Sequence, residues 1–382
     1  MKVLFCSPSR VAKGNPGGIV VWAQHIMNYY AEHRDNIDLE IFPLDREKNV
    51  HGNVLLSRLW DGSRVYIALL RKIRKRLKQS HYDVIHLCSS ASLSLVKDYF
   101  LLNIAKSLSV STVIHFHFGR IPELFIKKNW EYRILKKVLR RADRIVVIDQ
   151  ASCDVLTASG YSNVHYLPNP LSPSVNSIIG QLRENKIEKH DRQLLFVGHV
   201  IPAKGVFELV EACVGIPNIT LKIVGFVTSE VKEQLWNIGA KSKNKGWLNI
   251  AGCMSYQDVL REMLSCDLFI LPSYTEGFPN VILESMACGC SIVASGVGAI
   301  PEMLSGDEPC GIIIKPKSVE EIKDAILRMF DDRHFKVTCG RNAFKKVNDC
   351  YNMNVVWKQL TGIWRGIRTV SYTHLRAHET TL

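Results

Sequence analysis

Two glutamates with chemically useful surroundings, Glu276 and Glu284, are separated by seven residues. An apolar run at 268–272 precedes them and predicts a buried strand, so Glu276 is expected on the loop at its carboxyl end. A helix is expected to begin near Pro279 and Asn280, because proline is tolerated at the first helical positions. Glu284 then lies about one turn inside that helix. A loop carboxylate, a helix N-terminus and a second carboxylate could together hold a sugar hydroxyl, a phosphate and a ribose.

A glycine turn with two basic residues follows another apolar run, at 194–198. It contains Gly198, His199 and Lys204, and the two basic side chains could reach a diphosphate. A single lysine before a helix is usually solvated, but this one opens a strand–helix unit expected to face the same cleft as Glu276. The two carboxylates alone could also serve as the acid and base of a hydrolase. Lys204 and the nearby helix start instead favour a phosphorylated ligand.

The first half of the chain offers two weaker signals. Gly17 and Gly18 follow the first strand and precede a helix, where amides can approach a phosphate, although a plain tight turn fits equally well. The full G-x-G-x-x-G pattern is missing, which argues against a nicotinamide enzyme. His115 and His117 share one face of a strand end, but no third metal ligand is spaced nearby. His117, close to Gly119, is the better candidate to contact a substrate, whereas His115 fits a structural role.

Short β-rich runs alternate with helical patterns along the whole chain. Such alternation predicts two Rossmann-like domains facing a cleft, each a parallel sheet with helices on both faces. The first domain is expected at 1–170 and the second at 171–350, joined by a polar linker at about 169–193, with a helix at 351–369 returning to the first domain. The predicted strands are 3–7, 37–42, 84–87, 113–116 and 145–148 in the first domain, and 194–198, 221–225, 248–252, 268–272 and 292–295 in the second.

Composition limits the class of protein. With 382 residues, 47% hydrophobic and 22% charged, the chain reads as globular, and no apolar run approaches the ~20 residues of a membrane span. The start looks like a first strand rather than a signal peptide. Eleven scattered cysteines without a Cys-x-x-Cys motif are typical of reduced thiols in a cytoplasmic protein. The segment from Val370 to Thr380 resembles translated sequencing adapter, so 370–382 is set aside as a tail of that origin.

The net charge of +13 is unevenly distributed. Residues 1–170 hold 25 Lys and Arg against 14 Asp and Glu, and residues 171–382 hold 24 against 22. Two basic helical patterns, at 71–78 and 133–141, contribute much of the excess. Both an anionic membrane surface and an ordinary solvated helix face fit them, and the asymmetry of the halves favours the membrane. No nucleic-acid-binding module is recognisable, so nucleic acid is not an expected partner.

Taken together, these motifs resemble those of retaining glycosyltransferases of family 4, which have the two-domain GT-B fold. The resemblance covers about residues 1–365, and its most specific part is the Glu-x7-Glu signature from Glu276 to Glu284, followed by Gly298-x-x-Pro-Glu302. Glu302 fits a structural role better than a catalytic one. Supporting pieces are Gly198 with Lys204 and Gly205, Ile223-Val-Gly225, Asp83-Val-Ile-His86, the histidine-containing strand end, and Asn169.

The resemblance implies a role for each matching residue. Glu276 would contact hydroxyls of the donor sugar, Glu284 the ribose, and Lys204 the diphosphate. His117 matches the family's histidine near the reacting carbon, which makes His117, Glu276 and Lys204 the expected catalytic residues. The family commonly has arginine where this chain has His199, which leaves the role of His199 open. The donor-binding residues implied are Gly17, Gly18, Gly198, His199, Lys204, Gly277, Phe278, Pro279, Asn280 and Glu284.

The implied reaction moves a sugar from a nucleotide-diphosphate sugar to an acceptor hydroxyl with retention of configuration. Polysaccharide or glycolipid biosynthesis is the expected setting, with a glycan or lipid-linked acceptor. A soluble transferase or phosphorylase of small sugars on the same fold is the alternative. UDP- and GDP-linked donors both fit the motifs, and no metal or other cofactor is expected. The implied location is the cytoplasm, at the inner face of the membrane.

Overall fold

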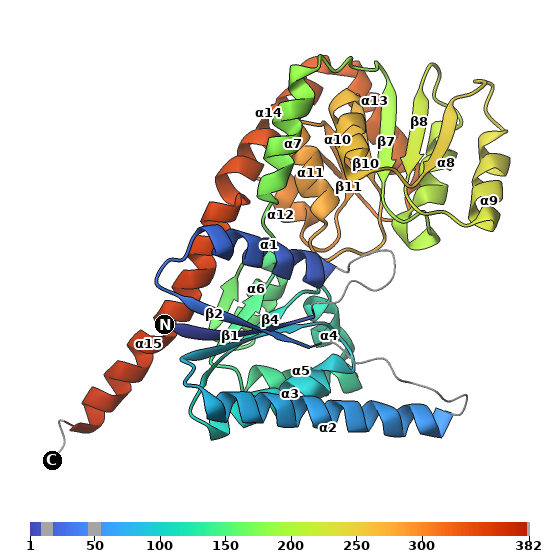
Figure 1. Cartoon of the computed structure of the whole chain (residues 1–382). Coiled ribbons are helices and arrows are strands. Elements are labelled where there is room, and N and C mark those ends of the chain that lie inside the picture. The colour runs from blue at the N-terminus through green and yellow to red at the C-terminus, as the bar shows by residue number, and fades with distance from the viewer. Residues whose placement is uncertain (9–17, 45–54, 380–382) are drawn as a thin grey trace. The chain divides into compact units, whose positions relative to one another are not determined.

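A computed structural model describes residues 1–8, 18–44 and 55–379, with only the backbone described at 55–64 and 368–379. Within the described residues the chain forms two compact units. Unit 1 comprises Met1–Pro168 together with Trp357–Leu382, and unit 2 comprises Asn169–Val356. The last long helix, α15 (Met353–Glu379), therefore contributes most of its length to unit 1 (Figure 1).

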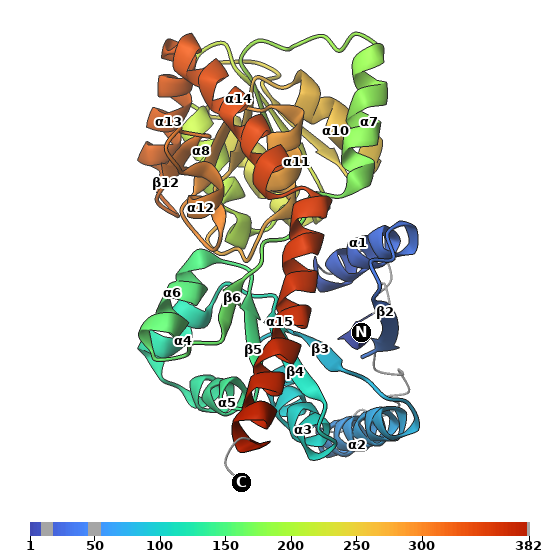
Figure 2. The same cartoon turned by 90° about the vertical axis from the view of Figure 1, so that its left-hand side faces the viewer.

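Unit 1 is built around a six-stranded parallel sheet in the order β2-β1-β3-β4-β5-β6. Helices α2, α3 and α5 lie on one face of this sheet and α1 on the other (Figures 1 and 2). The strands are β1 (Lys2–Ser7), β2 (Asp38–Pro43), β3 (Val84–Ser89), β4 (Ser111–Phe116), β5 (Arg144–Val147) and β6 (Val164–Tyr166). The helices before α15 are α1 (Gly18–Glu32), α2 (Leu55–Gln79), α3 (Ser94–Ser107), α4 (Ile121–Lys127), α5 (Trp130–Leu139) and α6 (Gln150–Ala158).

Unit 2 repeats the scheme with a parallel sheet in the order β12-β11-β10-β7-β8-β9. Its strands are β7 (Gln193–Val197), β8 (Thr220–Val224), β9 (Leu248–Gly252), β10 (Leu268–Leu271), β11 (Ile292–Ser295) and β12 (Ile312–Ile314). Its helices are α7 (Pro173–Glu184), the short 3₁₀ helix η1 (Pro202–Lys204), α8 (Val206–Cys213), α9 (Ser229–Gly239), α10 (Tyr256–Ser265), α11 (Asn280–Cys288), α12 (Ile300–Leu304), α13 (Val319–Asp331) and α14 (Arg333–Cys350).

The predicted fold class, two Rossmann-like parallel-sheet domains, is confirmed. Every predicted strand is present, and each sheet carries one further strand that the sequence did not signal, β6 and β12. Both are three-residue edge strands, too short to show a pattern of their own. The prediction that 169–193 is a plain linker was wrong, because α7 lies within it. Val175, Ile179 and Leu182 recur at helical spacing and are buried, so α7 packs as part of unit 2.

Three other features of the chain bear on predictions made from the sequence. The backbone is helical through Glu379, so the segment set aside at 370–382 continues α15 as far as that residue. Within the described part of the chain, no helix combines the length and apolar character needed to cross a membrane. All eleven cysteines are free thiols.

Candidate functional site

The unit 2 sheet has its topological switch point between β10 and β7, which are hydrogen-bonded neighbours although distant in sequence. Connections from strands on either side of such a point diverge, and ligands of open α/β sheets bind there, beyond the carboxyl ends of the strands. The loop after β7 carries Lys204 and the loop after β10 carries Glu276. Sheet order therefore brings together two candidate residues that are 72 positions apart in the chain.

Backbone contacts hold these two loops against each other. The amide of Tyr274, on the β10 loop, donates to the carbonyl of Ala203 at 2.9 Å. Gly205 ends η1 in the left-handed region, at φ +68°, and a Cβ there would lie 2.1 Å from the carbonyl oxygen of Pro272. Only glycine lets the chain leave η1 at this distance from the neighbouring loop. Lys204, immediately before it, is thus placed by the backbone rather than by its own side chain.

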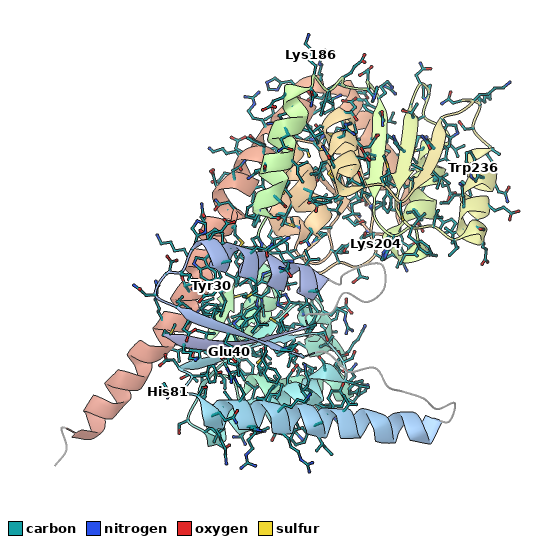
Figure 3. All side chains as sticks on the ribbon, viewed as in Figure 1. Tyr30, Glu40, His81, Lys186, Lys204 and Trp236 are labelled. Atoms are coloured by element: carbon teal, nitrogen blue, oxygen red, sulfur yellow. The ribbon has the colours of Figure 1, made fainter. Side chains whose placement is uncertain are left out.

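The ammonium of Lys204 donates to Oε1 of Glu276 at 2.6 Å. Lys204, which lies between β7 and α8, is labelled in Figure 3. The two side chains are 26% and 11% exposed, so the pair is shielded but open to a ligand. An ammonium has three donors, and one is used here, which leaves capacity for an anion. The sequence assigned Lys204 and Glu276 to different parts of a donor, and it did not predict that they pair directly.

Glu284 lies in the second turn of α11 and has its own partner. The phenol of Tyr256, the first residue of α10, donates to Oε1 of Glu284 at 2.9 Å. Burial raises the pKa of Glu284 to about 7, and the Tyr256 hydrogen bond acts in the opposite direction. Burial first, and then the charge of Glu284, raise the pKa of Tyr256. Glu284 is consequently a carboxyl that exchanges its proton near neutral pH.

The segment between the two glutamates is fixed by packing against its surroundings. The side chain of Phe278 is buried and stacks edge-on against Tyr351, so only its main chain is available to a ligand. Its carbonyl accepts a hydrogen bond from Asn169 at 3.3 Å. Pro279 is the N-cap of α11 and has no amide hydrogen, so it can supply no hydrogen bond to a phosphate. α11 begins at Asn280, as the sequence predicted.

Two further glycines, Gly277 and Gly298, lie where the loop after β10 contacts the segment after β11. The carbonyl of Gly277 accepts from the amide of Ala299 at 2.8 Å. A Cβ at Gly298, which has φ +57°, would lie 2.5 Å from the carbonyl oxygens of both Glu276 and Gly277. The loop that bears Glu276 therefore packs directly on the backbone of the segment after β11.

Gly198 and Gly225 make the closest backbone approach at this edge of the sheet. The amide of Gly198 donates to the carbonyl of Val224 at 3.0 Å. A Cβ at Gly225 (φ +144°) would lie 1.8 Å from the carbonyl oxygen of Gly198. His199 follows Gly198 and is exposed to solvent. Gly225 and Tyr256 were absent from the predicted site residues. The glycine after a strand was a usable signal for Gly225, whereas nothing local marks Tyr256.

Replacing Gly225 with alanine is expected to lower the free energy of unfolding of unit 2 by about 2–4 kcal/mol, because both the clash and the backbone angle oppose a side chain. Gly180 in α7 is the matched control, since a Cβ there meets nothing within 4 Å. Gly180→Ala is expected to stabilise by about 0.5–1 kcal/mol. Urea unfolding followed by circular dichroism measures both. An unchanged midpoint in Gly225→Ala would contradict the close approach.

In unit 1, His117 directly follows β4, and its amide donates to the carbonyl of Ser89 at 3.0 Å. Its ring lies 3.9 Å from that of His115 and 4.7 Å from that of Trp22, measured between centroids. Burial lowers the pKa of His117 to about 3, so its imidazole is neutral at pH 7. Its Nε2 is shielded from solvent and has no hydrogen-bond partner among the described residues. This nitrogen would gain a hydrogen-bond partner if a ligand group reached it.

The remaining unit 1 candidates differ in what the structure describes. His115 is fully buried, and burial together with the neighbouring His117 lowers its pKa, in keeping with a residue of the sheet interior. Gly18 is the first residue of α1 and is exposed. Gly17 lies outside the described residues. Over 1–8, 18–44 and 55–379, no group of three or more His, Cys, Asp or Glu side chains is arranged to hold a metal ion.

Two doubly wound units, with loops gathered at the carboxyl ends of parallel strands, define a two-domain Rossmann-like protein. Residues 16–175 match the family model described as Glycosyltransferase Family 4, and residues 180–346 match that of Glycosyl transferases group 1. Together with the fold, these matches place the chain among glycosyltransferases of the GT-B type.

Curated relatives point in the same direction. An uncharacterized glycosyltransferase of Methanocaldococcus jannaschii is 26% identical over 238 residues, which is 60% of this chain and 59% of that protein. The capsular polysaccharide biosynthesis glycosyltransferase CapM of Staphylococcus aureus is 24% identical over 195 residues, or 48% of this chain and 50% of that protein. The chain thus spans between half and three-fifths of the length of these relatives.

Among solved structures, the Anabaena protein HepE in complex with UDP is similar over 96% of this chain and 100% of that chain. The TM-score is 0.71 at 18% sequence identity, so the likeness concerns the fold.

Proposed function

We propose that the chain transfers a sugar from a nucleotide-diphosphate sugar to an acceptor hydroxyl, with retention of anomeric configuration. The observation that carries the proposal is the Lys204–Glu276 pair at the switch point of unit 2, with Glu284 on the helix that follows. One basic and two acidic groups on adjacent elements match the parts of such a donor: diphosphate, sugar hydroxyls and ribose.

In the proposed reaction the bond between the anomeric carbon and the diphosphate oxygen breaks, and a bond to the acceptor oxygen forms. Positive charge develops at the anomeric carbon while negative charge grows on the leaving phosphate. Lys204 stabilises that phosphate with the ammonium hydrogens that Glu276 does not use. The acceptor proton passes to the departing phosphate on the same face, which gives retention. Glu276 accepts hydrogen bonds from the sugar and need not move a proton.

In unit 1, His117 is the residue that we propose contacts the donor sugar near its anomeric carbon. A neutral imidazole can accept or donate one hydrogen bond to the sugar without adding positive charge near the oxocarbenium-like carbon. The chemistry as proposed uses side chains and backbone dipoles in the role that a divalent cation has in other transferases, and requires no metal ion.

The relatives support a donor class and a setting for the proposal. HepE was solved with UDP and with UDP-glucose, which makes a UDP-linked donor the first to test and a GDP-linked donor the second. CapM is a capsular polysaccharide biosynthesis enzyme, which favours a glycan or lipid-linked acceptor in cell-surface polymer or glycolipid synthesis. We place the protein in the cytoplasm, at the inner face of the membrane.

A thermal-shift screen against UDP-, GDP- and ADP-sugars tests the proposal. One nucleotide class at about 100 times its Kd is expected to stabilise the protein by about 2.7 kcal/mol, seen as a rise of several degrees in Tm. The rise should persist with EDTA and be lost in Glu284→Ala. Absence of a shift with all three classes would contradict the donor assignment, and a shift abolished by EDTA would contradict the metal-free reaction.

A further inference from the structure

The outer face of the helical layer in unit 1 carries a group of exposed apolar side chains. Helices α2, α3 and α5 lie side by side on the same face of the sheet, with α3 packed against both of the others (Figures 1 and 2). Leu93, Val96 and Phe100 follow one another at helical spacing along α3, and all three are exposed. Trp130, the first residue of α5, is 51% exposed.

Trp130 is near this group because the starts of α3 and α5 are joined. The carboxylate of Glu131 accepts hydrogen bonds from the backbone amide of Ser92 at 2.7 Å and from its hydroxyl at 3.3 Å. Trp130 therefore lies beside the start of α3. We call Leu93, Val96, Phe100 and Trp130 the α3 stripe. Single exposed apolar residues are ordinary on a protein surface, but a contiguous group of large ones indicates a contact surface.

Cations flank the α3 stripe on both sides, and carboxylates are absent from its surface. The only acids of α3 and α5 are Asp98 and Glu131, and both are buried. Residues 65–79 of α2 contain no acid. Within α3, α5 and residues 65–79 of α2, no carboxylate is exposed, and the nearest one, Asp143 beyond the end of α5, is paired with Lys106 of α3 at 3.1 Å. The exposed cations are Arg71, Lys72, Arg74, Lys75 and Lys78 on α2, Lys106 on α3, and Arg133, Lys137, Arg140 and Arg141 on α5 or just after it.

We propose that the outer face of α2, α3 and α5 docks unit 1 on an anionic phospholipid surface. The α3 stripe enters the boundary between headgroups and acyl chains, while the flanking cations pair with lipid phosphates. A solvated helix face normally mixes charges of both signs, which this one does not. A nucleic acid would account for the cations but leave the apolar stripe unused.

The position of the stripe in unit 1 extends the proposed function to the acceptor. α3 follows β3, and α4 and α5 follow β4, so Leu93 and Trp130 lie toward the carboxyl edge of the sheet. His117 lies at that edge, with its amide bonded to the last residue of β3. If the chain is a sugar transferase, a lipid-linked acceptor in the docked membrane would present its hydroxyl at this edge. Docking itself does not depend on the transferase activity.

Vesicle sedimentation of the full chain tests the proposal. The wild type is expected to bind phosphatidylcholine vesicles that contain phosphatidylglycerol, to bind pure phosphatidylcholine weakly, and to dissociate in high salt. Phe100→Ser combined with Trp130→Ser should lower the partition coefficient about tenfold or more. Arg133→Glu combined with Lys137→Glu should do the same through charge, since each basic residue near the surface contributes about 1 kcal/mol.

Matched controls come from α9 in unit 2. Trp236 projects from that helix and is 46% exposed, close to the value for Trp130 (Figure 3). Trp236→Ser, and Lys232→Glu on α9 combined with Lys241→Glu just after it, should leave vesicle binding unchanged. The donor-induced thermal shift should be the same in all variants, which shows that they fold and keeps a failure of docking separate from a failure of the proposed function.

Four outcomes would overturn docking on lipid. The wild type could remain in the supernatant with anionic vesicles. Both unit 1 variants could bind as the wild type does, or the α9 variants could lose binding to the same degree. Duplex DNA could bind with higher affinity than the vesicles and be lost in the charge variant alone, which would make the face a nucleic-acid surface.

Discussion

Replacing Lys204 with methionine is expected to lower kcat for sugar transfer about 10²–10³-fold, the usual cost of removing one preorganised group that stabilises developing charge. Its ammonium is 2.6 Å from Glu276, and both groups come from loops held by backbone contacts. The stabilisation is therefore in place before the leaving phosphate develops its charge. Initial rates with saturating donor measure the loss, and nucleotide affinity measured separately distinguishes a loss in binding from a loss in the reaction step.

A second ion pair of unit 2 provides the control. Lys222 on β8 donates to Glu262 at 2.6 Å, and the side chains are 21% and 17% exposed, close to the values for the Lys204–Glu276 pair. Lys222→Met removes a comparable interaction away from the switch point. It is expected to change stability slightly and to leave kcat as in the wild type. A similar loss of kcat in both variants would mean that the effect of Lys204 is structural.

Glu276→Gln in the Lys204→Met background tests whether the pair acts as a unit. Two residues in direct contact are expected to be non-additive, so the double variant should lose little more than the worse of the single variants. If the two losses instead multiply, Lys204 and Glu276 contact the substrate independently, and the ion pair is incidental to the reaction.

The sequence predicted the elements of this site better than their contacts. The strand at 268–272 and the start of α11 after Pro279 followed from local pattern, because an apolar run and a proline at a helix start each restrict the backbone by themselves. The contact between Lys204 and Glu276 depends on β10 lying beside β7. Strand order is a property of the whole sheet, and nothing in either loop encodes it.

The distinction between local sequence pattern and contacts across the fold also explains where the predicted and observed structures differ elsewhere. β6 and β12 exist because a neighbouring strand offers a free edge, not because three residues have a pattern. α7 was read as part of a linker because the segment 169–193 is mostly polar and contains prolines, although the three buried residues of α7 recur at helical spacing. Tyr256 approaches Glu284 from 28 positions away, across the packing of α10 on α11. Pairings of this kind become visible only when the helices are placed.

The affinity for the nucleotide sugar is expected to fall about tenfold between pH 8 and pH 6 through Glu284. Burial raises the pKa of this carboxyl to about 7 in the free protein, whereas the proposed contact uses an ionised carboxylate that accepts hydrogen bonds from the ribose hydroxyls. Protonation therefore competes with the donor once the pH falls below that value. Isothermal titration with a nucleotide sugar, which lacks the terminal phosphate that titrates near pH 6, isolates the effect.

Variants of Glu284 and Tyr256 distinguish the titration of Glu284 from other causes of the pH dependence. Glu284→Gln should bind weakly at every pH, with the pH dependence gone. Tyr256→Phe removes the hydrogen bond that lowers the pKa of Glu284, so its affinity should begin to fall at a higher pH than in the wild type. His199→Gln should keep the wild-type profile. If His199→Gln abolishes the profile and Glu284→Gln keeps it, the titrating group is the histidine beside Gly198.

The ionisation of Glu284 is also expected to lower the stability of the free protein. The folded pKa of about 7 exceeds the ordinary value of 4.5, so between these values the folded state binds more protons than the unfolded state. Glu284 therefore costs stability as the pH rises from about 4.5 to 7, and the full cost applies above pH 7. The free energy of unfolding of Glu284→Gln should exceed that of the wild type by about 1 kcal/mol at pH 5, and this difference should grow to about 3 kcal/mol at pH 8. A group that weakens the free fold when it ionises, and that the proposed donor would require in that form, is typical of a binding residue rather than a structural one.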